Sequence, residues 1–215
     1  MRLTRSWPWR ILQAIARPLA MMLFRLKVYG RDNVPSQGGV LIVSNHQSYL
    51  DPILLPIQLK RPVNYIAKSE LFRNRIFGWF LRSILNAFPV RQGHGDVRAV
   101  RETIRRLRQG HVMTIYPEGA RTEDGEIGPL QPGVALIIKR ANVSVVPAII
   151  VGAYDAWPIH RRFFRCRPIY IQFGPPIDFT GKDDVETLAT IQETLRSMFA
   201  ALRSDIAHGR NTPSE

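Results

Sequence analysis

Cysteine is almost absent from this sequence, because Cys166 is the only one among 215 residues. A single cysteine cannot form an internal disulfide, and it excludes the cysteine-rich zinc modules. Long apolar runs are absent near the N-terminus, where the longest uncharged stretch, residues 18–24, is far shorter than the roughly 20 residues of a membrane-spanning helix. The serine-hydrolase pattern Gly-X-Ser-X-Gly does not occur either. These absences argue against a disulfide scaffold, a bundle of spanning helices and a usual serine hydrolase.

Acidic residues are scarce in the first half of the chain, and the net charge of +13 follows from that imbalance. Residues 1–31 hold seven Lys or Arg and no acid, and residues 60–110 hold twelve bases and three acids. Residues 111–215 are close to neutral. The surplus implies a polyanionic partner, and phospholipid headgroups, nucleic acid and phosphorylated small molecules all fit that description. Charge alone does not choose among them.

The N-terminal segment, residues 1–30, combines tryptophan, arginine and apolar side chains. Trp7, Trp9 and Arg10 open an apolar stretch that Arg17 interrupts. These two arginines disfavour a signal peptide, whose apolar core carries no charge. Indole rings beside arginines are typical of a segment that lies in the membrane interface. We therefore predict an amphipathic helical anchor on an anionic membrane surface, with a helix packed on the protein's own core as the alternative.

After the N-terminal segment, short apolar runs alternate with stretches of helical periodicity. This alternation predicts an α/β fold in which helices flank a central sheet that is mostly parallel or mixed. The domain is expected to span residues 31–206, followed by a disordered tail at 207–215. Helices are expected over residues 51–59, 97–108 and 185–206. The predicted strands are Val40–Ser44, Val63–Ala67, Asn86–Val90, Val112–Tyr116, Val145–Val151 and Ile169–Phe173.

A histidine and an aspartate, His46 and Asp51, come just after the predicted strand 40–44. In open α/β sheets ligands bind at the carboxyl ends of the strands, which is where His46 is expected. A histidine that acts as a general base needs a partner on its far nitrogen, and a turn followed by a helix start would bring Asp51 there. The plain alternative is a loop histidine with Asp51 serving only as the N-cap of the next helix.

A second candidate stretch, Glu118-Gly119-Ala120-Arg121, follows the predicted strand 112–116. Glycine allows a ligand to approach the backbone, and the planar guanidinium of Arg121 suits phosphate. Glu118 would orient Arg121 or bind a substrate hydroxyl. The alternative is a β-turn with a surface ion pair, which contributes little energy.

Together these stretches resemble the glycerolipid acyltransferases typified by 1-acylglycerol-3-phosphate acyltransferase. That family carries a His-X4-Asp block, an arginine block, a Glu-Gly-Thr-Arg-type block and an apolar block with proline, in this order. The corresponding residues here are His46–Asp51, Phe88–Arg91, Glu118–Arg121 and Val146–Ile149. Four blocks in the right order and spacing are far more specific than any one of them. The resemblance covers roughly residues 28–180.

The resemblance implies a glycerol-3-phosphate acyltransferase-like fold and the transfer of a fatty acyl group from a thioester to the free hydroxyl of a lysophospholipid. His46 would remove the hydroxyl proton, and Asp51 would orient His46. The two arginines of the blocks would hold the acceptor's phosphate, and Glu118 would lie near its glycerol hydroxyls. The implied substrate-binding residues are Arg91, Glu118, Gly119 and Arg121. Lysophosphatidate is the expected acceptor, giving phosphatidate, while glycerol 3-phosphate, larger lysophospholipids and lyso-ornithine lipid stay open.

The implied reaction needs no metal and no tightly bound cofactor, because acyl-CoA or an acyl carrier protein supplies the acyl group. Direct attack on the thioester needs no acyl-enzyme, so Cys166 has no expected role. The protein is expected at the cytoplasmic face of the cell membrane, peripheral or monotopic. Ala120 departs from the usual threonine, and we expect altered affinity or substrate preference rather than lost activity.

Four arginines of the predicted helix 97–108 form one stripe, because they are spaced 3, 4 and 3 residues apart. A solvated basic face is one interpretation of this stripe. Contact with anionic lipid, with the phosphates of coenzyme A or with an acidic carrier protein is the other. The four are Arg98, Arg101, Arg105 and Arg108.

Two rival functions use the same residues differently. A non-enzymatic nucleic-acid-binding protein would interleave aromatic platforms with its bases, whereas the aromatic residues here cluster at 7–9 and 72–80. A lipid hydrolase would direct the His46 and Asp51 pair at water instead of a lipid hydroxyl.

Overall fold

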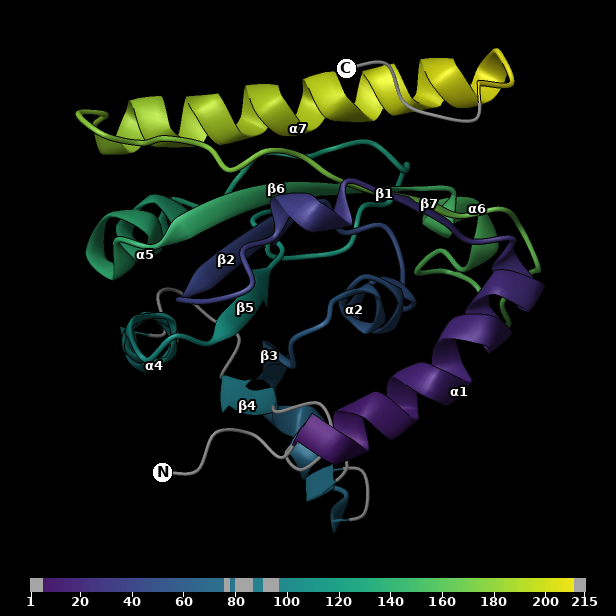
Figure 1. Cartoon of the computed structure of the whole chain (residues 1–215), viewed down its shortest axis with the longest axis horizontal. Coiled ribbons are helices and arrows are strands. Elements are labelled where there is room, and N and C mark those ends of the chain that lie inside the picture. Colours follow the sequence, from purple (N-terminus) through teal and green to yellow (C-terminus); the bar gives the residue numbers. More distant parts are fainter. Residues whose placement is uncertain (1–5, 76–77, 80–86, 91–96, 211–215) are drawn as a thin grey trace.

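The protein, described by a computed structural model, is characterised over residues 6–75, 78–79, 87–90 and 97–210. Within these residues seven strands form one sheet, and helices cover both of its faces (Figure 1). The strands are β1 (Lys27–Tyr29), β2 (Val40–Ser44), β3 (Val63–Lys68), β4 (Ala87–Val90), β5 (Val112–Ile115), β6 (Ser144–Val151) and β7 (Tyr170–Phe173). The α-helices are α1 (Ser6–Phe24), α2 (Asp51–Leu54), α4 (Val97–Arg108), α5 (Gly133–Ala141), α6 (Ala153–Ala156) and α7 (Asp184–Ala207).

The sheet has the strand order β1-β7-β6-β2-β5-β3-β4. Neighbouring strands run parallel except β6 and β7, which pair antiparallel. The predicted α/β fold with a mostly parallel or mixed sheet is therefore confirmed. All six predicted strands are present, although Asn86, the predicted start of β4, lies outside the described residues. The sequence does not predict β1, which lies inside the N-terminal segment and pairs with β7 at the edge of the sheet.

β2 lies in the middle of the sheet, and every one of its residues is buried. Successive side chains point to opposite faces. Val40 and Ile42 pack with α1 and α2, whereas Leu41 and Val43 pack with α4, α5 and α7. Because both faces of the sheet are covered, the strand is apolar from Val40 to Val43 instead of alternating, and only its last residue, Ser44, is polar. Figure 1 shows α7 along one side of the sheet and α1 and α2 on the other.

α1 packs on the domain through a face that includes Trp9, Gln13 and Phe24, all of them buried. The Gln13 amide donates to the carbonyls of Ile57 and Leu59. Trp9 is only 2% exposed, so its prediction as a membrane anchor is wrong, and the alternative of core packing describes this face. The predicted anchor residue Arg10 is exposed, and the side chain of Trp7 lies outside the described part. Among the described residues no helix combines the length and apolarity needed to cross a bilayer.

Two predicted helices differ in detail from the structure. The helix expected over residues 51–59 is split into α2 and a 3-10 turn, Pro56–Gln58, because proline at position 56 has no N–H to continue the helix. The last helix, α7, begins with a capping box between Asp183 and Glu186. Its predicted apolar face is correct except at Val185, which is 76% exposed. The predicted tail begins at the last residue of α7, and residues 211–215 lie outside the described part.

Candidate active site

The loops that follow β2 and β5 meet at one edge of the sheet. These strands are parallel neighbours, with Val43 opposite Ile115, so both carboxyl ends lie at the same edge. His46 follows the first strand and Glu118 follows the second. The Thr122 N–H donates to the His46 carbonyl at 2.9 Å and joins the two loops. The first and third predicted blocks are therefore adjacent, as the sequence leads one to expect.

Asn45 sets the direction in which the loop leaves β2. Its buried side-chain amide donates to the Ile150 carbonyl at 2.9 Å and accepts the Ile150 N–H at 2.8 Å. This reciprocal pair imitates one more step of strand pairing with β6. A buried amide with these hydrogen bonds holds one geometry, so the next residue, His46, is presented in a fixed position.

The His46 ring and the Asp51 carboxylate form a hydrogen-bonded pair, with Nδ1 and Oδ2 2.9 Å apart. The same Oδ2 accepts the backbone N–H of Gln47 at 2.6 Å and of Ser48 at 2.7 Å. Asp51 is therefore not the N-cap of α2, a position that Leu50 occupies. Since an ionised carboxylate only accepts hydrogen bonds, Nδ1 carries the proton of the neutral ring and Nε2 is left as a proton acceptor.

The Asp51 carboxylate is completely buried. Burial raises its pKa, and the hydrogen bond and charge of His46 together with the two backbone amides offset only part of that rise. The second carboxylate oxygen, Oδ1, has no hydrogen-bond partner among the described groups. Burial thus disfavours the ionised carboxylate of Asp51, and its hydrogen-bond partners reduce that cost. Carboxylates with pKa values perturbed in this way are typical of functional sites.

Glu118 turns its carboxylate toward backbone amides. Oε1 accepts the His46 N–H at 2.9 Å, and Oε2 accepts the Gly128 N–H at 3.1 Å. Burial raises the Glu118 pKa, while these two amides and the nearby His46 lower it in part. Because both oxygens are engaged within the protein, the contacts of Glu118 favour a positioning role over the predicted contact with substrate hydroxyls.

Tyr116 lies flat against the His46 ring, with ring centroids 4.1 Å apart and an interplanar angle of 19°. Its hydroxyl is buried and has no hydrogen-bond partner among the described groups. Burial, with the nearby Asp51 and Tyr65, raises the Tyr116 pKa well above its usual value. Tyr116 is a site residue that the motifs did not predict, and its only signal in the sequence is its position two residues before Glu118, at the end of β5.

The Arg121 guanidinium stacks on the Tyr49 ring, 3.6 Å from the ring centroid. Within the described part of the chain no carboxylate forms an ion pair with Arg121. Its N–H groups therefore remain available to an anion. Gly119, at φ 78°, makes the left-handed turn that leads to this side chain. The other predicted phosphate ligand, Arg91, lies outside the described residues.

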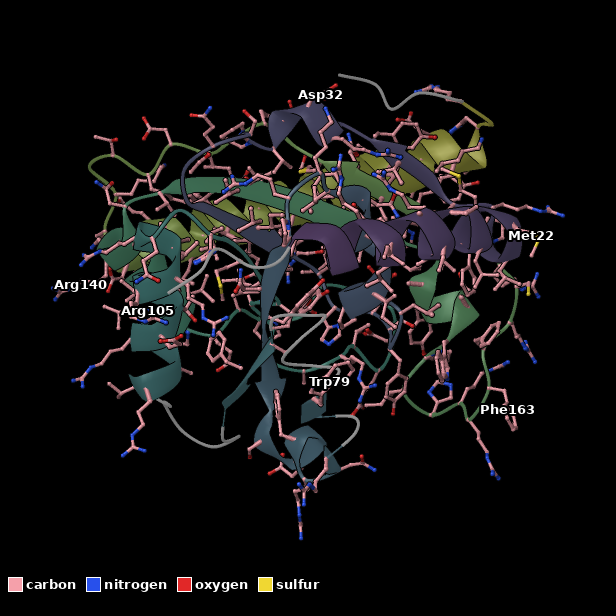
Figure 2. The ribbon with its side chains drawn as sticks, turned by 60° about the horizontal axis from the view of Figure 1, so that its bottom comes forward. Met22, Asp32, Trp79, Arg105, Arg140 and Phe163 are labelled. Atoms are coloured by element: carbon pink, nitrogen blue, oxygen red, sulfur yellow. The ribbon has the colours of Figure 1, made fainter. Side chains whose placement is uncertain are left out.

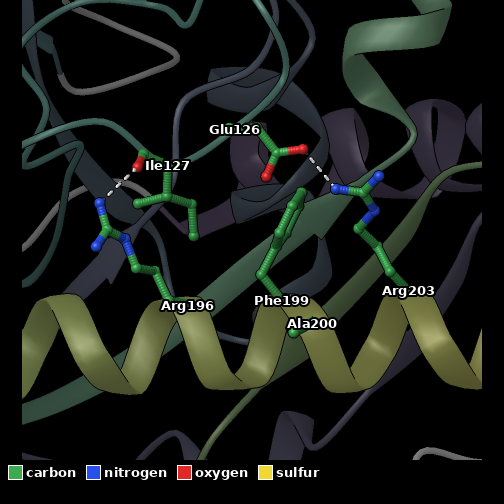
Figure 3. A pocket seen from close by; sticks show the side chains of 6 residues that line it. All are labelled: Glu126, Ile127, Arg196, Phe199, Ala200 and Arg203. Carbon is green, nitrogen blue, oxygen red and sulfur yellow. Dashed lines mark hydrogen bonds and ion pairs between the residues drawn. The ribbon is translucent and has the colours of Figure 1, made fainter.

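The acidic loop that follows Arg121 is tied to α7. Glu126 forms an ion pair with Arg203 at 2.6 Å, and Arg196 reaches the Ile127 carbonyl at 3.4 Å. These side chains line a hollow between the loop and the helix (Figure 3). Gly128, which binds Glu118, follows directly in this loop. This acidic loop therefore connects α7 to the Glu118 carboxylate.

A family model described as Acyltransferase matches residues 25–151, which include β2, β5 and both site loops. The chain belongs to the acyltransferase family. A 1-acyl-sn-glycerol-3-phosphate acyltransferase of Bacillus subtilis (strain 168) is similar to it, with 30% identity over 185 residues that cover 84% of this chain and 89% of the relative. Human 1-acyl-sn-glycerol-3-phosphate acyltransferase beta is 28% identical over 177 residues, covering 81% of this chain and 62% of the relative.

Among solved structures, this acyltransferase is similar to the 1-acyl-sn-glycerophosphate (LPA) acyltransferase PlsC from Thermotoga maritima. The two share 25% sequence identity at a TM-score of 0.78, over 91% of this chain and 80% of the other. The family and the fold predicted from the sequence are therefore confirmed.

The arginine stripe of this acyltransferase lies on α4, where it is partly used within the fold. Arg105 pairs with Glu102 at 2.6 Å, and Arg108 donates to the Arg140 carbonyl. Arg98 and Arg101 are exposed near the start of the helix. Their contact with an acyl donor or a membrane stays a prediction.

Proposed function

We propose that this acyltransferase transfers a fatty acyl group to the free hydroxyl of 1-acyl-sn-glycerol 3-phosphate, giving phosphatidate. The names of its relatives support this acceptor. The observation that carries the proposed mechanism is the hydrogen bond between His46 and the buried Asp51, because it leaves Nε2 free to take a proton. The stacked Tyr116 and the Glu118 bond to the His46 backbone hold the imidazole in place.

In the proposed reaction, His46 Nε2 removes the acceptor's hydroxyl proton while that oxygen attacks the thioester carbonyl. The new carbon–oxygen bond forms, the carbon–sulfur bond breaks, and the leaving thiolate takes the proton from the imidazolium. Asp51 stabilises the imidazolium between these two transfers. Acyl-CoA or an acyl carrier protein supplies the thioester, and the proposal includes no metal and no bound cofactor.

Arg121 is the described residue best placed to bind the acceptor's phosphate. Stacking on Tyr49 fixes the plane of the guanidinium, which leaves its edge free for a bidentate contact with phosphate oxygens. Arg91, from the second block, is proposed as its companion. Lysophosphatidate fits two arginines better than an acceptor without a terminal phosphate; glycerol 3-phosphate and other lyso-lipids are the alternatives.

We further propose that α1 lies on an anionic membrane at the cytoplasmic face of the cell. Besides its buried face, the helix has an apolar outer stripe, spaced 4, 4 and 3 residues apart, with Ile15 65% and Met22 72% exposed. Helices that are apolar on their outer face as well need a second apolar environment, and the acyl boundary of a bilayer is one. The stripe consists of Ile11, Ile15, Leu19 and Met22.

The test is acyl transfer from palmitoyl-CoA to a panel of acceptors: lysophosphatidate, glycerol 3-phosphate, a larger lysophospholipid and lyso-ornithine lipid. Product lipid is identified by mass spectrometry, and released thiol is measured in parallel. We expect phosphatidate to form fastest and activity to disappear in His46→Ala. Full activity in that variant would refute the mechanism. Faster acylation of another acceptor would mean that this acceptor, and not lysophosphatidate, is the substrate. Release of thiol without an acylated lipid would indicate a hydrolase.

A further inference from the structure

The connection between α6 and β7 exposes aromatic and basic side chains together. Within residues 159–167, here named the 159–167 loop, Phe163 is 74% exposed, and Phe164 and Ile159 are exposed as well. Exposed aromatic side chains are costly in water, so a cluster of them marks an interaction surface. Figure 2 shows Phe163 pointing outward from the ribbon, on the same side of the molecule as Met22.

The 159–167 loop is strongly basic although the second half of the chain is nearly neutral. It contains no acidic residue, and within the described residues none of its arginines forms an ion pair. Asp155 lines the same hollow as three of them. Positive charge interleaved with aromatic rings is complementary to an anionic lipid surface. The four arginines are Arg161, Arg162, Arg165 and Arg167.

The backbone of the 159–167 loop is held in place. The Trp157 indole donates to the Arg161 carbonyl at 3.0 Å, and the Arg165 N–H donates to the Ala156 carbonyl at 2.7 Å. Phe164 contacts the Trp157 ring, with ring centroids 5.9 Å apart. These contacts fix the backbone of the loop, and they hold Phe163 in an exposed position.

The loop packs against the last residue of α1. Phe164 meets Phe24 at the end of α1, with ring centroids 5.7 Å apart, and the Ile169 N–H donates to the Phe24 carbonyl at 2.9 Å. Met22, the last residue of the stripe, is two positions before Phe24. The loop therefore packs beside the end of α1, and Met22 and Phe163 lie on the same side of the molecule (Figure 2), where one bilayer can contact both.

The loop also reaches the candidate active site through a series of aromatic rings in tilted contact. Trp157 lies 5.2 Å from Tyr49, and Tyr49 carries the Arg121 guanidinium at 3.6 Å. Ser48 adds a hydrogen bond from its hydroxyl to the Trp157 carbonyl at 2.7 Å. Direct contacts thus connect Phe164 with Arg121, the proposed phosphate ligand.

We propose that the 159–167 loop is a second membrane contact, in which Phe163 inserts among the lipids of an anionic bilayer and the neighbouring arginines bind phospholipid headgroups. This contact would hold Arg121 at headgroup level, where the phosphate of a membrane-borne acceptor lies. The inference rests on the proposed membrane location of the enzyme and adds to it a specific surface outside α1.

Cys166 allows a direct test, because it is exposed in this loop and is the only cysteine of the chain. A polarity-sensitive fluorophore on Cys166 is expected to shift to shorter wavelength with phosphatidylcholine vesicles that contain phosphatidylglycerol, and to be quenched by brominated lipid. Vesicles of phosphatidylcholine alone should give a weaker signal. Co-sedimentation of the labelled protein without any spectral change would overturn the proposal. A spectral change with acidic acyl carrier protein but not with vesicles would overturn it too, in favour of a donor site.

Variants separate this inference from the proposed function. Phe163→Ser and the double variant Arg162→Glu with Arg165→Glu should each weaken vesicle binding about tenfold. Both should retain activity on a short-chain, monomeric lysophosphatidate and lose it on acceptor embedded in vesicles. Val185→Ser is the matched control, because Val185 is as exposed as Phe163 and lies on α7, against the other face of the sheet.

Three outcomes are distinguishable in this experiment. Unchanged vesicle binding and activity in both loop variants would refute the loop contact while leaving the acyl transfer intact. Loss of monomeric activity in Phe163→Ser would contradict a pure docking role. Parent enzyme that acylates no lysophosphatidate of either kind would refute the proposed function itself.

Discussion

The Glu118 carboxylate accepts the backbone N–H of His46 at 2.9 Å, so the third sequence block holds the first one in place. The bond joins residues 72 positions apart and lies beside the proposed general base. The second oxygen of the Glu118 carboxylate accepts the Gly128 N–H, and Gly128 lies in the loop that α7 contacts. Activity is therefore expected to depend on a glutamate that need not touch the substrate.

Replacing Glu118 tests this positioning role. In Glu118→Gln one oxygen still accepts the His46 N–H, but the new amide nitrogen faces the Gly128 N–H and cannot accept it. We expect kcat to fall about tenfold with little change in the KM for acceptor. Glu123→Gln, on the same loop with an exposed side chain, is the control. A raised KM with unchanged kcat would indicate substrate contact instead.

Asp51→Asn separates activity from stability. The amide cannot stabilise an imidazolium as the carboxylate does, so we expect kcat to fall roughly a thousandfold. Folding should not suffer, because burial raises the Asp51 pKa above its ordinary 3.8. The folded protein therefore binds the carboxyl proton of Asp51 more tightly than the unfolded chain does. As pH rises from the ordinary pKa to the raised pKa of the folded state, the contribution of Asp51 to the free energy of unfolding falls. Urea denaturation at several pH values should show the unfolding free energy of Asp51→Asn increasing relative to that of the parent as pH rises above the ordinary Asp51 pKa. A gain on lowering the pH would contradict the assignment.

The buried hydroxyl of Tyr116 is expected to be unfavourable for folding. Tyr116→Phe keeps the ring stacked on His46 and removes an oxygen without a described partner, so unfolding free energy should rise by about 1 kcal/mol. Activity should change less than about twofold. Tyr116→Ala, by contrast, removes the stack and leaves a cavity that costs about 3–5 kcal/mol. Chemical denaturation distinguishes these results; a less stable Tyr116→Phe would mean that the hydroxyl has a partner such as water.

Tyr49 is expected to act on acceptor binding through Arg121. Tyr49→Leu removes the aromatic face under the guanidinium, which is worth about 0.5–1 kcal/mol, so the KM for lysophosphatidate should rise about twofold to fivefold. Tyr49→Phe retains the face and should behave like the parent. Steady-state kinetics with varied acceptor decides between them, and equal effects of both changes would point to the hydroxyl instead of the stack.

Substitutions on the two faces of α1 are expected to affect different properties, folding stability on the buried face and membrane binding on the outer face. Trp9→Ala should cost about 3–5 kcal/mol of unfolding free energy, because the indole is buried in the core. Ile15→Asp should change stability by less than about 0.5 kcal/mol, since this side chain is exposed, but it should weaken vesicle binding. Thermal denaturation and co-sedimentation measure the two effects. Retained vesicle binding in Ile15→Asp would exclude the outer stripe as a membrane contact.

The predictability of the strands follows from burial on both faces. β2, β5 and β6 are mostly apolar runs, and such runs are recognisable without any knowledge of their partners. β1 was missed because its three residues, Lys27–Tyr29, show no periodic pattern. They become a strand only because β7, more than 140 residues later, presents a free edge at residues Tyr170 to Gln172.

By itself the sequence determined the class of protein and the site's chemical groups. The order and spacing of His46, Asp51, Glu118 and Arg121 resemble the glycerolipid acyltransferases, and the family model confirms the family over residues 25–151. Only the tertiary structure decided what each side chain faces. Glu118 turns to backbone amides, and Trp9 turns inward while Ile15 turns outward. A helix that is apolar on two faces carries no signal for which one packs, so the choice depends on partners distant in the chain, here the carbonyls of residues 57–59.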